Sequence, residues 1–235
     1  RGILRAALVR SRPLITRRLS GNFSAGAKGL QRMPKKLKHQ VEQLRPVLHL
    51  FCEGANTEPW YYKQYIKRFC RVPSRVIIEP TKKNTPVQLV QVAKRMKKTH
   101  PNDPVWVVYD RESVAKYSEE LHQQARQLAE ANGINVALSN VCFEVWLLLH
   151  RRQSCPACSC CDALTSRKEF KEAFPHYDKA DEINFKPEEI DAARRRAEVM
   201  NQQTIAGADP KWKYPSEWNP YTDAYRVLDA IDSFK

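Results

Sequence analysis

From residue 47 onward, short apolar runs alternate with longer amphipathic segments. The apolar runs have the length of strands and are rich in β-branched and aromatic residues. They span residues 47–53, 74–80, 103–110 and 134–140. Segments with helical spacing lie between them, at residues 57–70, 85–99 and 118–133. Strands separated by helices in this way indicate βαβ units, so we predict an α/β fold with a mostly parallel, four-stranded sheet flanked by helices.

Local signals mark the helix ends. Thr57 and Thr85 are N-cap candidates, each followed by a proline in the first turn, and Gly133 follows the third predicted helix. A cysteine-rich stretch at residues 151–165 comes after the last strand, and residues 166–235 are polar with helical periodicity. We therefore expect a cysteine-rich loop and then a helical C-terminal part.

The net charge of +14 is unevenly distributed. Residues 1–46 carry 12 lysines and arginines against one acid, whereas residues 47–235 carry 28 against 25. The basic segment has its first methionine at Met33. Its composition resembles a mitochondrial transit peptide and equally translated upstream sequence or a cloning remnant; we favour a non-native extension or a disordered arm. The folded domain is therefore expected at residues 47–235.

Composition narrows the class of protein. No window approaches the roughly 18 to 20 consecutive apolar residues of a membrane span. Seven cysteines, in a chain where we find no secretory signal, argue against a disulfide framework. The chain contains neither a Walker A string nor GxGxxG, which argues against ATP hydrolysis by the chain itself. We expect a soluble, cytoplasmic protein without a membrane partner.

Polar residues follow the predicted strands. Glu53 ends the first strand, Asp110 ends the third with Glu112 two residues on, and Asn140 ends the fourth. The carboxyl ends of parallel strands meet at one edge of a sheet. Carboxylates that converge there repel one another, and oxygen ligands favour a hard cation such as Mg²⁺ or Mn²⁺. The alternative is that these acids are helix caps or solvated loop residues.

Four stretches together carry a family resemblance. They are CEGANTEPWYYKQY, VVYDRES, LSNVCFEVWLLLH and NPYTDAYRVL. In order and spacing they resemble the motifs of the RloB family, over roughly residues 47–232, and that family's fold is similar to Toprim domains. The resemblance implies a bacterial or archaeal protein from restriction or abortive-infection phage-defence loci, with an AAA or ABC-type ATPase partner.

The resemblance also implies site residues. In Toprim-like domains an acid after the first strand and an acid-x-acid pair after the third bind a divalent metal that supports nuclease or phosphoryl-transfer chemistry. These positions correspond to Glu53, Asp110 and Glu112. The second acid of the pair is usually Asp, so the Glu side chain at 112 reaches one methylene further. Val141 stands where the family commonly has proline.

The stretch FEVWLLLH supplies two further candidates. We assign Glu144 a place facing the metal, and His150 a role as phosphate contact or proton donor. Six residues separate them, about 120° from a shared direction on a helix, so they are not expected to point at one spot. The residues between them are most simply core. His49, inside the first strand, is expected to be a structural histidine.

The cysteine-rich stretch CPACSCC is a possible structural zinc site. It contains Cys155, Cys158, Cys160 and Cys161, and His150 and His176 flank it. A CxxC pair with neighbouring thiols is a zinc-ligand spacing, but a second distant CxxC is missing. The alternative is an irregular loop that faces solvent.

Two functions follow as hypotheses. The first is a Mg²⁺- or Mn²⁺-dependent nuclease that cleaves RNA or DNA as the effector of a defence pair with an ATPase. The second is a noncatalytic module that binds nucleic acid or a nucleotide and regulates that ATPase. They differ in whether the carboxylates are needed for chemistry.

Overall fold

A computed structural model of the chain describes residues 45–82, 85–179 and 183–235. The predictions for the basic N-terminal segment concern residues that lie outside these ranges, apart from its last two. Among the residues that the structure describes, no helix has both the length and the apolar character needed to span a membrane.

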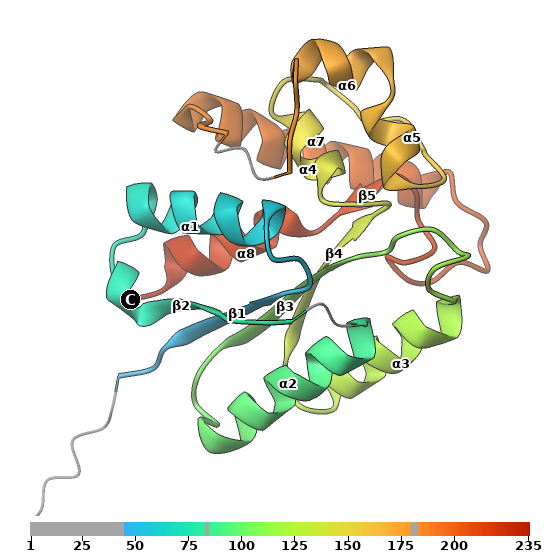
Figure 1. The fold of residues 1–235 in the computed structure, drawn as a ribbon. Coiled ribbons are helices and arrows are strands. Elements are labelled where there is room, and N and C mark those ends of the chain that lie inside the picture. The colour runs from blue at the N-terminus through green and yellow to red at the C-terminus, as the bar shows by residue number, and fades with distance from the viewer. Residues whose placement is uncertain (1–44, 83–84, 180–182) are drawn as a thin grey trace, which may run out of the picture. The chain divides into compact units, whose positions relative to one another are not determined.

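A single sheet with strand order β2-β1-β3-β4-β5 forms the centre of the fold (Figure 1). Four strands run parallel: β1 (Leu48–Cys52), β2 (Val76–Glu79), β3 (Val105–Asp110) and β4 (Asn135–Asn140). The short β5 (Tyr221–Thr222) pairs antiparallel with β4. The predicted α/β class is confirmed, but the predicted count of four strands is wrong. A strand of two residues is too short to show the alternation by which strands are recognised.

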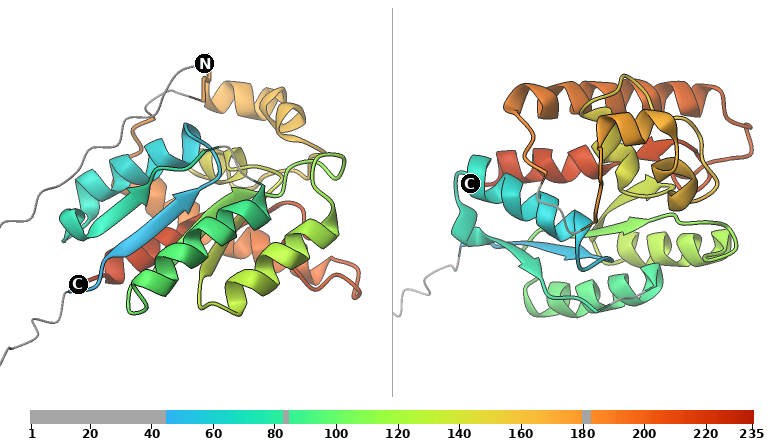
Figure 2. Two further views of the ribbon diagram at one scale, coloured as in Figure 1. Left: turned by 60° about the horizontal axis from the view of Figure 1, so that its bottom comes forward. Right: turned by 45° about the horizontal axis from the view of Figure 1, so that its top comes forward.

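Helices cover both faces of the sheet. Figure 1 shows α1 (Thr57–Phe69) and α8 (Ala224–Ser233) on one face, and α2 (Pro86–Thr99) and α3 (Glu119–Glu130) on the other. The turned views of Figure 2 show the same two layers. The remaining helices follow β4 in the chain: α4 (Glu144–Leu149), α5 (Cys161–Thr165), α6 (Lys168–Ala173) and α7 (Pro187–Ala206). A 3-10 turn, η1 (Pro73–Arg75), precedes β2.

Two apolar cores hold these layers on the sheet. Neighbouring residues of β3 show the division, since Val107 belongs to the core under α2 and α3, and Val108 to the core under α1 and α8. All five residues of β1 are buried, as expected for a strand covered on both faces. Burial on both faces explains why the strands read as continuous apolar runs in the sequence.

The helix caps agree with the sequence at one position and differ at another. Thr85 accepts a hydrogen bond from the Gln88 backbone, in a capping box that begins α2. The prediction for Thr57 is wrong, because Asn56 is the N-cap and Thr57 is the first helical residue. The Thr57 hydroxyl instead donates to the carbonyl of Lys179 at 3.3 Å. This contact ties the start of α1 to the segment after α6.

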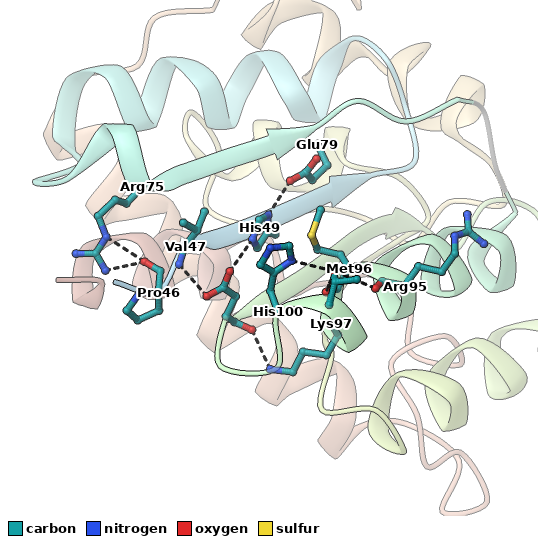
Figure 3. A network of polar contacts seen from close by, with 11 residues as sticks. Pro46, Val47, His49, Arg75, Glu79, Arg95, Met96, Lys97 and His100 are labelled. Atoms are coloured by element: carbon teal, nitrogen blue, oxygen red, sulfur yellow. Dashed lines mark hydrogen bonds and ion pairs between the residues drawn. The ribbon is translucent and has the colours of Figure 1, made fainter. Parts of the chain in front are cut away.

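His49 joins three parts of the fold through its imidazole (Figure 3). Its Nδ1 lies 2.6 Å from Glu79 Oε1, and its Nε2 lies 3.1 Å from Asp103 Oδ2. The Asp103 carboxylate also accepts a hydrogen bond from the Val47 backbone N–H, and the Asp103 carbonyl accepts one from Lys97 Nζ. The buried histidine therefore has a structural role, linking β1 to β2 and to the loop before β3.

Candidate functional site

The candidate site lies where two central strands end. β1 and β3 are neighbours, but the chain leaves β1 toward β2 on one side and leaves β3 toward β4 on the other. This reversal of direction is a topological switch point, where open α/β sheets bind ligands outside the carboxyl ends of the strands. Glu53 follows β1, and Asp110 ends β3. The Asp110 backbone N–H donates to Glu53 Oε2 at 3.3 Å, so the two acids lie side by side.

Three more acids line the same cleft, which has a volume of about 360 Å³. The full set of carboxyl groups is Glu53, Glu58, Asp110, Glu112 and Glu144. Two lysines also line it, Lys116 and Lys179. Five carboxyl groups against two ammonium groups give the cleft an excess of negative charge when all are ionised.

Glu53 is buried, with 7% of its surface exposed, and is held by two donors. The Tyr117 hydroxyl donates to Oε1 at 2.9 Å, and the Asp110 N–H donates to Oε2. Burial raises the pKa of Glu53, although these two hydrogen bonds oppose the shift. Arg111 fixes the loop that carries Tyr117, because its guanidinium donates to the carbonyls of Tyr117 and Ser216.

Glu58 points back from the first turn of α1 toward the end of β1. A Cβ on Gly54 would lie 2.6 Å from Glu58 Oε2, so any larger residue would push this carboxyl group out of its position. Burial, and then the charges of Glu144 and Glu53, raise the pKa of Glu58 to about 7. Sequence reasoning missed this residue, because an acid in the first turn of a helix is commonly there to complement the helix dipole.

Asp110 and Glu112 lie in different electrostatic surroundings. Burial raises the pKa of Asp110 well above its usual range, and so do the charges of Glu58, Glu144 and Glu53. Glu112 has a left-handed backbone (φ 60°), and its N–H donates to the carbonyl of Val141 at 2.9 Å. Its carboxylate pairs with Lys116, four residues on. Glu112 therefore carries its own counter-charge, and Asp110 is surrounded by acids.

Glu144 begins α4 and is almost completely buried. Tyr177 Oη donates to its Oε1 at 2.9 Å, Cys161 Sγ donates to its Oε2 at 3.2 Å, and Lys179 Nζ lies 3.6 Å from Oε1. Burial alone would raise the pKa of Glu144, but the Lys179 charge and the thiol hydrogen bonds hold it below its usual value. Glu144 is therefore an ionised carboxylate inside the fold.

Comparison with known proteins identifies the family of the chain. A family model described as RloB-like protein matches residues 48–231. The chain belongs to the RloB-like family. The match extends from β1 into α8 and includes every acid of the cleft. Searches among curated proteins and among solved structures give no match.

His150 of this RloB-like chain does not line the cleft. Its ring stacks on Phe185 with 3.7 Å between ring centroids, Nδ1 lies 3.0 Å from the Trp146 carbonyl, and Nε2 lies 3.0 Å from the Tyr61 hydroxyl. Burial lowers the pKa of His150 to about 3. Glu144 and His150 thus point to different places, as their six-residue spacing predicts.

Asn140, the other polar residue predicted at the strand ends, is also turned away from the cleft. It is buried, and its side-chain amide donates to the carbonyl of Ser216 at 3.0 Å. It therefore anchors a loop and adds no ligand to the acids.

The cysteines of CPACSCC do not gather around one point. Cys160 Sγ accepts a hydrogen bond from the Ala163 N–H and caps α5, while Cys155 Sγ donates to the Pro156 carbonyl. Among the described residues, one group of three potential metal ligands has its atoms all within 4.8 Å of one another: Cys142, Glu144 and Cys161. In the same part of the chain, no three acids of the cleft have oxygens that all lie within 4.8 Å of one another.

Proposed function

We propose that this RloB-like chain is a divalent-metal-dependent nuclease. The observation that carries the proposal is the cluster of Glu53, Glu58 and Asp110 at the switch point of the sheet. Burial raises all three pKa values, and the charges of neighbouring acids of the cleft raise them further. The two lysines of the cleft form ion pairs with the other two acids. A hard cation is the ligand that relieves such repulsion.

The donor set fits Mg²⁺ or Mn²⁺, because these acids offer oxygen atoms to a cleft lined by polar residues. Glu53, Glu58 and Asp110 would hold the ion, and Glu112 would join them by giving up its pair with Lys116. A bound ion supplies charge neutralisation at a phosphate oxygen and lowers the pKa of a water molecule. Lys116 and Lys179 place positive charge where a phosphate would enter.

The biological setting of the proposal comes from the family. A Toprim-like nuclease that works as the effector of an antiphage or abortive-infection system, together with an ATPase, agrees with the RloB-like match. The strand order 2-1-3-4 with acids after β1 and β3 supports the Toprim-like assignment.

A noncatalytic module is the second candidate. It is favoured by the ion pairs Glu112–Lys116 and Glu144–Lys179, which already neutralise two of the five acids, and by the spread of the remaining oxygens. In that case the cleft would bind a nucleotide or nucleic acid through a cation without cleaving it, and would regulate the ATPase.

The deciding experiment compares Glu53→Gln with wild type in a cleavage assay on RNA and DNA, with Mg²⁺ or Mn²⁺ and with the ATPase partner present. We expect Glu53→Gln to lower the cleavage rate about 100-fold or more. Glu188→Gln, an exposed glutamate in the first turn of α7, is the matched control and should cleave normally. Wild-type protein that binds nucleic acid but never cleaves it would establish the regulatory module instead.

A further inference from the structure

Two thiols and one carboxylate meet behind the acidic cleft. Cys142 and Glu144 flank Phe143 in the turn from β4 into α4, and Cys161 is the first residue of α5. One ligand atom from each of Cys142, Glu144 and Cys161 lies within 4.8 Å of the other two. Their exposed fractions are 1%, 1% and 8%. The group is therefore built inside the fold from two segments of the chain.

The cysteine-rich segment is anchored so that Cys161 faces inward. Asn219 accepts a hydrogen bond from the Cys158 N–H and donates to the Cys158 carbonyl, which fixes the approach to α5. Cys160 then caps the helix with its sulfur. Cys161 follows as the first residue of α5, and its buried thiol donates to Glu144 at 3.2 Å.

A positive group already lies at this cluster. Lys179 Nζ is 3.6 Å from Glu144 Oε1 and 3.9 Å from Cys161 Sγ. The Lys179 side chain is 57% exposed, so it can swing into solvent and leave the position to another cation. Two sulfur ligands and one oxygen ligand favour a borderline-soft ion such as Zn²⁺ over Mg²⁺.

We propose that Cys142, Glu144 and Cys161 form a zinc site, separate from the hard-ion site at Glu53, Glu58 and Asp110. Three protein ligands leave one position of a tetrahedral zinc shell open. Glu144 lines the acidic cleft, so this open position adjoins it. The site differs from the one that the CPACSCC spacing suggests, because it takes Cys161 from that motif and its two partners from the β4–α4 turn.

Cobalt titration of the metal-free, reduced full-length chain tests the site. Co²⁺ bound to thiolates gives an intense charge-transfer band in the near ultraviolet, whereas Co²⁺ bound to carboxylates alone does not. We expect the band to saturate at one Co²⁺ per chain, to disappear when Zn²⁺ is added, and to persist in excess Mg²⁺. Cys142→Ser and Cys161→Ser should each weaken Co²⁺ binding by more than about 10-fold, since even outer-shell changes cost that much.

Cys155→Ser and Cys158→Ser are the matched controls and should keep the band. An absent band in wild type, or a band lost in these controls and kept in Cys161→Ser, would overturn the proposal. Because Cys142 is buried, circular dichroism must show that its variant is folded. Lys179→Met provides a test that leaves the core intact: removal of the competing ammonium should tighten Co²⁺ binding several-fold, and unchanged or weaker binding would also count against the site.

Discussion

Replacing Glu58 with glutamine should stabilise the metal-free protein at alkaline pH. The carboxyl group is buried, and its pKa is raised from an ordinary 4.5 to about 7. Between these two values the folded protein holds a proton that the unfolded chain has lost, so the free energy of unfolding falls as pH rises through this window. The shift corresponds to about 3 kcal/mol, reached in full above pH 7. Glutamine keeps the shape and removes the charge.

The measurement is urea unfolding of wild type and Glu58→Gln in chelator at pH 4.5 and pH 8. We expect the difference in unfolding free energy to be near zero at the lower pH and to approach about 3 kcal/mol in favour of the variant at the higher pH. Glu188→Gln controls for the helix dipole, since loss of an acid from a first turn should destabilise by about 0.3–1 kcal/mol. If Glu58→Gln instead lowers the free energy of unfolding at pH 8, as Glu188→Gln does, Glu58 only complements the helix dipole. The argument that Glu58 belongs to a cluster of mutually repelling acids then fails.

Three further predictions concern neighbouring residues. Gly54→Ala should displace the Glu58 carboxylate. Calorimetry should therefore show weaker Mn²⁺ binding, whereas the melting temperature should change little. Tyr117→Phe removes a hydrogen bond that lowers the pKa of Glu53. The rising limb of the plot of cleavage rate against pH should therefore move to higher pH, and an unmoved profile would exclude Glu53 as the titrating group. His49→Leu leaves two carboxylates without their partner and should cost about 3 kcal/mol in urea unfolding, whereas less than 1 kcal/mol would contradict its structural role.

The sequence predicts the layout of the fold better than the contents of the site. The four parallel strands and their helices follow from apolar periodicity, and the order of strands brings Glu53 beside Asp110. β5 escapes prediction because its two residues, which pair with the end of β4, are too few to show the alternation of a strand. The place of Glu58 in the site is not predicted, because its carboxyl group occupies the space left by the absent side chain of Gly54. The spacing of residues in the sequence does not show such a three-dimensional contact.

Prediction from spacing is weakest where distant segments meet. The CPACSCC motif predicts a possible zinc site within one short stretch, and in the structure Cys155 and Cys160 form hydrogen bonds with neighbouring backbone groups. Cys161 finds Glu144, 17 residues earlier in the chain. Lys179 reaches the same carboxylate from the segment that Thr57 holds. Such contacts arise from the packing of α4, α5 and α1, and are visible only once those helices are in place.

The lysines divide the acids of the cleft into two groups. Lys116 and Lys179 neutralise Glu112 and Glu144, and Glu144 is accordingly the acid whose pKa is lowered. The other three acids, Glu53, Glu58 and Asp110, have raised pKa values, because burial and the charges of neighbouring acids disfavour ionisation. Structural ion pairs would explain the first group without any ligand. Within the described part of the chain, the second group forms no ion pair of this kind, and carboxyl groups that are removed from water beside other acids lower the stability of the fold. This cost is the one that the proposed cation would offset, which is why these three acids carry the proposal.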